Sequence, residues 1–129
     1  MSEIPNELRY TKEHEWIRLD GDAVVVGITD YAQNALTDVV WVEMDPDLEG
    51  TDVAEMESFC SVESTKSVSE IYSPVSGTIL EFNMSLEDAP EQLNQSPYQD
   101  GWIAKIKPHN LDDIDNLLDA EAYSNVVGE

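Results

Sequence analysis

One lysine in this chain stands in a setting that suits the presentation of its amine. Lysine is scarce, because only four of the 129 residues are lysines: Lys12, Lys66, Lys105 and Lys107. Lys66 alone lies in the middle of a segment, among small hydroxyl residues, Ser64, Thr65 and Ser67. Small neighbours leave a long side chain accessible, and a turn between two strands would hold the amine on a rigid support. Taken alone, the pattern is more typical of an ordinary surface lysine.

The residue patterns that usually perform catalysis are missing. The six glycines never form a phosphate-binding loop, and the two histidines, His14 and His109, lie far apart. Cys60 is the only cysteine, which excludes an internal disulfide and a cysteine-based metal cluster. Acidic residues are so numerous that the sequence does not pair any of them into an acid and a base. We therefore expect no catalytic residue, no metal site, a structural His109 and a buried, inert thiol at Cys60.

The charge of the chain is strongly negative. Twenty-eight acidic residues stand against six basic ones, which gives a formal net charge of −22. This field repels phosphate backbones and anionic lipid head groups over about 8 Å at physiological salt, so we expect neither nucleic acid nor a membrane as a partner. The charge promotes solubility, and it can also steer the protein toward basic rims around partner active sites.

The length and the apolar runs limit how many domains the chain can form and where it can be located. A mass of 14.4 kDa is enough for one domain with a single core. No apolar run approaches the roughly 20 residues that cross a bilayer, and the first residues lack the pattern of an export signal. A single cysteine suits a reducing compartment. We therefore expect one domain in the cytoplasm.

The first half of the chain predicts a hairpin, a short helix and a strand. Residues 15–19 and 23–28 are β-prone and flank the turn signal Asp20-Gly21-Asp22, which favours a hairpin. Thr29 is a suitable cap for a short helix, whose apolar stripe consists of Ile28, Tyr31, Ala32, Ala35 and Leu36. Residues 39–42 then read as another strand.

The second half continues this β-rich pattern and ends in a helix. Residues 57–72 mix β-formers with serines and contain neither glycine nor proline, while residues 78–83 alternate as a strand. A loop with one helical turn near Pro90 and a strand at residues 102–106 follow. Asn110 is a plausible cap for a C-terminal helix with a break before Tyr123; its apolar face contains Leu111, Ile114, Leu117 and Leu118. These short strands predict a small sandwich or barrel capped by a terminal helix.

Several segments resemble the glycine cleavage H-protein family. The run VESTKSVSEIYSPVSGTI around Lys66 resembles the lipoylation segment of that family. The segments YTKEHEW, VVGITDYAQNAL, SLEDAPEQLNQSPYQDGW and LLDAEAY also look like the family and follow in its order. Together they cover almost all of residues 8–125, which makes the resemblance specific.

The resemblance implies a fold and a site of modification. The fold would be mainly β, a barrel-sandwich hybrid like a lipoyl domain with short helices and a C-terminal helix, in a single lipoyl-carrier domain of residues 1–129. Lipoic acid would be bound covalently to Lys66 at the tip of a hairpin. Lipoate-attaching enzymes of this family read a glutamate three residues before the lysine and a glycine eleven after it, and Glu63 and Gly77 occupy these positions.

The resemblance also implies a function as a carrier rather than an enzyme. Lipoylated Lys66 would take an aminomethyl group from glycine decarboxylase, a pyridoxal-phosphate enzyme, to an aminomethyltransferase, and would pass electrons to dihydrolipoamide dehydrogenase. The family is expected to be a monomer that docks transiently. The loaded arm would fold into a cleft, for which Glu15, Ile28 and Glu70 are the candidates, and an acid there could pair with an ammonium group. The two glutamates could equally be ordinary acidic residues of the surface.

Other interpretations of the same lysine remain open. An H-type protein could relay lipoate to other enzymes or serve only as a docking scaffold, because the same lysine suits each role. A biotin carrier would place methionines beside the lysine, where Thr65 and Ser67 stand here. A lipoyl domain of a 2-oxo-acid dehydrogenase would lack the segments KEHEW and SPYQDGW.

Overall fold

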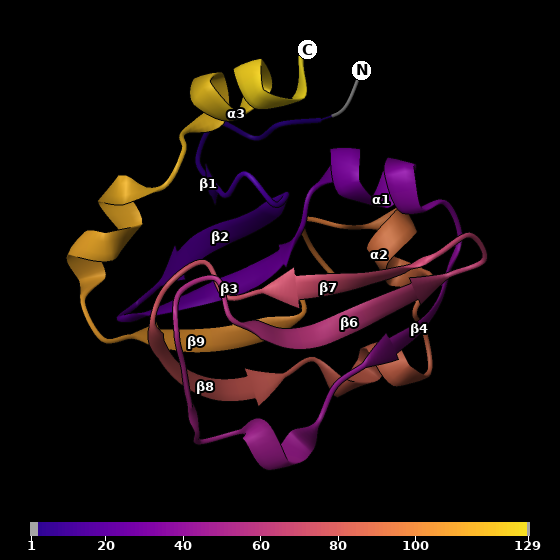
Figure 1. The fold of residues 1–129 in the computed structure, drawn as a ribbon, viewed down its shortest axis with the longest axis horizontal. Helices are drawn as coiled ribbons and strands as arrows, with labels where there is room; N and C mark the ends of the chain where they lie inside the picture. Colours follow the sequence, from indigo (N-terminus) through magenta and orange to yellow (C-terminus); the bar gives the residue numbers. More distant parts are fainter. Residues whose placement is uncertain (1–2, 129) are drawn as a thin grey trace.

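The structure, a computed structural model, describes residues 3–128, and within them nine strands form two antiparallel sheets (Figure 1). The larger sheet has the order β1-β2-β3-β9-β8-β5; its strands are β1 (Arg9–Tyr10), β2 (Glu15–Asp20), β3 (Ala23–Ile28), β9 (Ala104–Pro108), β8 (Gly77–Phe82) and β5 (Asp52–Val53). The smaller sheet consists of β4 (Val39–Glu43), β6 (Ser58–Ser64) and β7 (Val68–Tyr72). The predicted mainly β fold is confirmed, and its strands are organised in two sheets rather than in one closed barrel.

Six short helical segments join and flank these strands. The α-helices are α1 (Asp30–Leu36), α2 (Gln92–Gln95) and α3 (Ala120–Val127), and the 3₁₀ helices are η1 (Pro46–Leu48), η2 (Met84–Glu87) and η3 (Leu111–Asn116). Thr29 caps α1 as predicted, since its hydroxyl accepts a hydrogen bond from the Ala32 amide at 3.2 Å. Within residues 3–128, none of these helices is both long and apolar enough to cross a membrane.

The predicted C-terminal helix is two separate helices. Asn110 does cap the first, because its side chain accepts a hydrogen bond from the Asp112 amide at 3.0 Å, but this segment is the 3₁₀ helix η3. The chain is then extended, because Leu118 exchanges two backbone hydrogen bonds with Tyr10, of 2.8 and 2.9 Å. A new cap at Asp119 starts α3. The expected break before Tyr123 therefore lies before Ala120 instead, because a β-bridge overrides the helical pattern.

The strand at residues 78–83 is irregular in a way that the alternation did not predict. The simple pattern places Ile79 and Glu81 on one face and Leu80 and Phe82 on the other. In the structure Ile79 and Phe82 are both buried, whereas Leu80 is exposed. A β-bulge between Ile79 and Glu81 in the pairing with β9 inserts one residue and exchanges the faces.

Strand β3 is buried along its whole length because it supplies two cores. Val24 and Val26 belong to the main core, which also takes Val42 and Val62 from the smaller sheet. Val25 points to the opposite face and joins a second cluster with Leu8, Tyr10, Trp16, Tyr98, Ala120 and Tyr123. The C-terminal helix α3 is thereby packed against the larger sheet, as Figure 1 shows.

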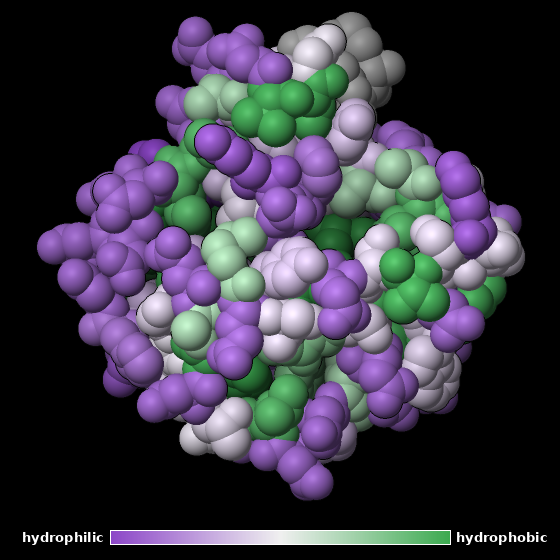
Figure 2. All heavy atoms as spheres, viewed as in Figure 1, coloured by the Kyte–Doolittle hydropathy of each residue, from purple (hydrophilic) through white to green (hydrophobic). Residues whose placement is uncertain are grey.

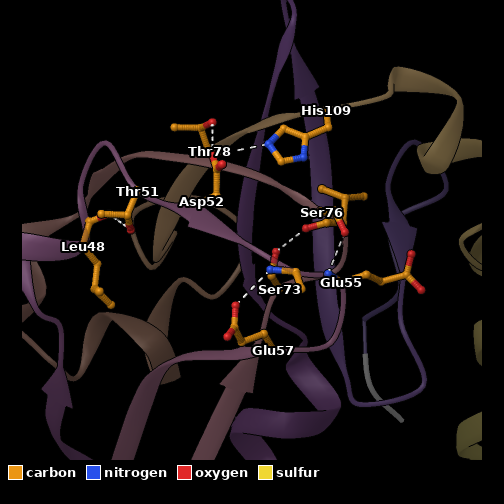
Figure 3. Close-up of polar contacts among 11 residues, drawn as sticks. Leu48, Thr51, Asp52, Glu55, Glu57, Ser73, Ser76, Thr78 and His109 are labelled. Atoms are coloured by element: carbon orange, nitrogen blue, oxygen red, sulfur yellow. Dashed lines mark hydrogen bonds and ion pairs between the residues drawn. The ribbon is translucent and has the colours of Figure 1, made fainter.

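Polar contacts join the edge strand β5 to β8 and to the residue that follows β9 (Figure 3). The Asp52 carboxylate accepts a hydrogen bond from the Thr78 hydroxyl at 2.9 Å and lies 3.4 Å from Nε2 of His109. These two partners lower the pKa of the Asp52 carboxyl, the Thr78 hydrogen bond having the larger effect. His109 thus contacts Asp52 of the edge strand β5 through two exposed side chains, and its predicted structural role stays a prediction.

Candidate functional site

Lys66 lies at the tip of the β6–β7 hairpin, and Ser64 organises its turn. The Ser64 hydroxyl accepts hydrogen bonds from the amides of Lys66 and Ser67, at 3.1 and 3.0 Å, and donates one to the Ser67 carbonyl at 3.1 Å. The Ser64 amide donates a further bond to that carbonyl at 2.8 Å. Residues 64–67 are not among the described residues with positive φ. The turn therefore needs no glycine, because a hydroxyl takes over part of its hydrogen bonding.

The neighbouring loop braces the turn, while the Lys66 side chain stays exposed. The amide of Thr65 donates a hydrogen bond to the Asp38 carbonyl at 3.0 Å. Within residues 3–128, the Lys66 ammonium forms neither a hydrogen bond nor an ion pair, and the residue is exposed. The backbone at Lys66 is consequently fixed from two sides, whereas the amine at its end is free to react.

A cavity of about 540 Å³ adjoins Lys66. Its apolar wall comes from α1 and the flanking strands, with Ile28, Ala32 and Leu36 among its members, and polar groups, including Glu70, complete it. Ile28 is buried, and Glu70 is exposed, with its carboxylate accepting a hydrogen bond from the Ser58 hydroxyl at 3.0 Å. The structure thus brings together Lys66 and two of the three predicted cleft residues. In Figure 1, α1 lies on the side of the molecule where the β6–β7 hairpin ends, and residues of both line this cavity.

Glu15 lies behind this cavity and does not belong to its lining. Only 1% of the residue is exposed, and its carboxyl accepts hydrogen bonds from the Thr11 hydroxyl at 2.5 Å and the Tyr72 amide at 3.3 Å. Burial raises the pKa of Glu15 to about 7, and the two hydrogen bonds only partly oppose this rise. The lining residue Tyr72 connects the Glu15 carboxyl to the cavity through its backbone.

The two residues predicted for lipoate-ligase recognition lie in different sheets. Glu63 is exposed on β6, where it pairs with Val68 of β7 and Trp41 of β4, directly beside the hairpin turn. Gly77 is buried at the start of β8, between Val53 and Pro108. The structure therefore places Glu63 close to Lys66, whereas Gly77 belongs to the other sheet, where it pairs with Val53 and Pro108.

Most of the lining residues were not predicted as site residues, among them Glu13, His14 and Tyr31. Tyr31 was assigned to the apolar stripe of α1, and part of this stripe, including exposed Ala35, lines the cavity instead of the core. His14 adopts a positive φ of 74° in the turn before β2, which no glycine marks. Helical spacing reveals a stripe, but it does not reveal which part of the stripe a neighbouring strand covers.

Replacing Ser64 by alanine should destabilise the fold by about 1 kcal/mol, because two partly buried amides lose their acceptor. The turn should also become mobile, and lipoylation of Lys66 should slow. Thermal unfolding and the rate of enzymatic lipoylation measure the two effects. Ser67→Ala is the control, since Ser67 takes part in this turn through its backbone. Equal behaviour of the two variants would show that the Ser64 hydroxyl does not organise the turn.

Known proteins resemble this chain over nearly its whole length. Residues 8–129 match the family model of the glycine cleavage H-protein. The glycine cleavage system H protein of Geobacillus thermodenitrificans is 54% identical over 125 residues, 97% of each chain, and that of Staphylococcus carnosus is 51% identical over 126 residues, 98% of each. The crystal structure of a glycine cleavage system H protein from Mycobacterium marinum has a TM-score of 0.87 at 39% identity, covering 98% of this chain and 100% of that one.

These similarities include the hairpin that carries Lys66. Glycine cleavage H proteins are the lipoyl carriers of their system and are not enzymes, so the predicted carrier function, lipoyl cofactor and non-catalytic role are confirmed at the level of the family. Its partners are components of the glycine cleavage system. On the family model, on relatives more than half identical and on a solved structure of the same fold, this chain belongs to the glycine cleavage H-protein family.

Proposed function

We propose that Lys66 is the lipoylated residue, and that its arm carries an aminomethyl group from glycine decarboxylase to an aminomethyltransferase and electrons to dihydrolipoamide dehydrogenase. One observation carries this proposal: the Lys66 amine is exposed and unpaired within residues 3–128, yet its backbone is fixed by Ser64. A lipoate-attaching enzyme can therefore acylate it, with Glu63 and Gly77 as the proposed recognition residues. A tether on a rigid support raises the local concentration of its end group at each partner.

The residues beside Lys66 fit a lipoyl arm. When bound, the lipoyl group supplies a disulfide that accepts electrons and a carbon group at the end of an apolar stem. Ile28, Ala32 and Leu36 would bind that stem, since they form an apolar wall of the cavity. Glu70 at the cavity would hold a cationic cargo by a charge-assisted hydrogen bond. The buried Glu15 carboxyl is outside the cavity lining, and it would act on the arm only through the lining residue Tyr72, from whose amide it accepts a hydrogen bond.

The surface of the protein supports transient docking. Hydrophilic residues cover much of the face in Figure 2, with smaller apolar patches between them. A formal charge of −22 would attract basic rims around the active sites of the partner enzymes. The proposal includes a cytoplasmic location, which the single cysteine supports, and one lipoyl-carrier domain over residues 1–129.

Mass analysis of protein expressed with lipoate and a lipoate-attaching enzyme tests the proposal. We expect a lipoyl group on the peptide that contains Lys66 and none in Lys66→Arg, because arginine cannot be acylated in its place. Lys12→Arg, which changes another exposed lysine, should remain modified. An unmodified Lys66 beside an enzyme that lipoylates a known carrier would refute the assignment. Glycine cleavage with purified partner enzymes then distinguishes the carrier from a lipoate relay or a docking scaffold.

A further inference from the structure

A buried tyrosine of the C-terminal helix contacts two other segments that border the cavity beside Lys66. The hydroxyl of Tyr123 lies 2.7 Å from the Thr29 hydroxyl and 2.8 Å from Nδ1 of His14. Its ring is fully buried and stacks on Tyr10, with 4.7 Å between the ring centroids. One hydroxyl in α3 thereby contacts the cap of α1 and the turn before β2.

His14 separates this hydroxyl from the cavity. Its ring packs on Tyr31 with centroids 4.8 Å apart, and both residues line the cavity beside Lys66. The backbone of His14 is held by the Thr29 amide, which donates a hydrogen bond to the His14 carbonyl at 3.0 Å. Burial lowers the pKa of His14 despite the adjacent charge of Glu13, which favours the neutral ring. The orientation of a neutral ring depends on its hydrogen-bonding partners.

The Tyr123 hydroxyl also contacts the cap of α1, the helix that forms one wall of the cavity. Thr29 accepts a hydrogen bond from the Ala32 amide while it contacts Tyr123, so the first turn of α1 and the imidazole share one anchor. Tyr31 and Ala32 of that turn line the cavity. Loss of the hydroxyl would leave His14 free to change rotamer and would remove one of the contacts that fix the start of α1.

We propose that Tyr123 is a positioning residue for the lipoyl arm: its hydroxyl holds His14 and the start of α1 as walls of the cavity, so that a carried aminomethyl group is shielded from water. This inference rests on the proposed function, since it takes the cavity beside Lys66 as the place where the loaded arm lies. Water that enters the cavity would release the cargo as ammonia and formaldehyde and regenerate the thiol, with one water consumed for each group lost.

The first test compares the lifetime of the cargo in Tyr123→Phe and in wild type. We expect ammonia to be released several-fold faster from the loaded variant. Tyr10→Phe is the matched control, because it removes another buried hydroxyl, which donates to the Pro5 carbonyl at 2.5 Å and, within residues 3–128, forms no hydrogen bond with α1 or the cavity lining. Equal acceleration in both variants would show a general loss of stability and would overturn the proposal.

The second test needs no lipoyl group. In ¹⁵N NMR spectra of the imidazoles, His14 of wild type and of Tyr10→Phe should show one tautomer, whereas Tyr123→Phe should show averaging between the two. Unchanged His14 signals in Tyr123→Phe would refute the positioning role even where the carrier function holds. If the wild-type protein cannot be loaded with an aminomethyl group but its His14 signals change in Tyr123→Phe, the carrier function and the shielding would be refuted. The contact between Tyr123 and His14 would still stand.

A further variant covers the case in which Tyr123→Phe does not fold. Asparagine tolerates the positive φ of His14 but is too short to reach the hydroxyl, so His14→Asn should also release ammonia faster than wild type. Because the two side chains share the contact between the Tyr123 hydroxyl and His14, the double variant should release ammonia more slowly than the sum of the two single effects predicts. Additive acceleration, or a wild-type rate in His14→Asn, would contradict the inference.

Discussion

Replacing Gly77 by alanine will lower the free energy of unfolding by roughly 3 kcal/mol, at the upper end of the cost of overpacking. A Cβ atom at Gly77 would lie 2.3 Å from the Lys107 carbonyl oxygen and 2.9 Å from Cγ2 of Ile106. The first of these neighbours is backbone, so relief requires β8 and β9 to separate at the point where Gly77 pairs with Pro108. Denaturant unfolding measures the loss.

Gly21→Ala provides the matched control for this prediction. A Cβ at Gly21 would meet nothing within 4 Å, so its cost comes only from the positive φ of 66° and should be about 1 kcal/mol. Equal stability of the two variants would show that β9 moves away from β8 at little cost in free energy. The result also bears on lipoylation: if folded Gly77→Ala is modified normally, the glycine eleven residues after Lys66 serves the sheet rather than the attaching enzyme.

The parts of the fold that could be predicted from the sequence are those determined by neighbouring residues. The β2–β3 hairpin follows from the turn signal at Gly21, and the start of α1 follows from Thr29 as a cap. Cys60 was expected to be buried and inert, and its thiol is buried, with a pKa that burial raises to about 12. In each case the decisive interaction lies within a few residues, or depends on the residue type alone.

The features that could not be predicted depend on contacts between distant segments. The bulge after Ile79 arises from the pairing of β8 with β9, and the interruption before α3 arises because Leu118 bonds Tyr10, more than a hundred residues earlier. The turn at Lys66 was hard to recognise for a different reason: a serine hydroxyl replaces the usual glycine. The resemblance to a family placed Lys66 on a hairpin where local signals were weak.

The candidate site shows the same division. Lys66, Ile28 and Glu70 were selected by motif position, and the structure brings them together. Neither His14 nor Tyr123 was selected as a site residue, because their contact joins positions 109 residues apart. Periodicity assigns a side chain to a face, but the cavity depends on how α1, β7 and the turn before β2 pack against each other.

Glu15→Gln will stabilise the protein increasingly as the pH rises from about 4.5 to about 7, relative to wild type. The folded state raises the pKa of this carboxyl from 4.5 to about 7, so the folded protein binds more protons than the unfolded chain in that window. Stability contributed by the neutral carboxyl is therefore present at low pH and is lost as the pH rises through the window. The loss amounts to roughly 3 kcal/mol by linkage, for a side chain that is almost fully buried.

Glutamine remains neutral, so the difference in unfolding free energy between variant and wild type should grow over this pH range and then level off above pH 7. Any constant cost of fitting the amide between Thr11 and Tyr72 cancels, because only the change with pH is compared. Asp52→Asn is a control of opposite sign: its partners lower the pKa of Asp52, so the wild-type advantage at that position disappears toward acid pH. A flat difference for Glu15→Gln between pH 4.5 and 7 would mean that this carboxyl is ionised in the folded protein. The Glu15 side chain would then need an access to water, and its two hydrogen-bonding partners, Tyr72 and Thr11, each line a cavity that could provide it.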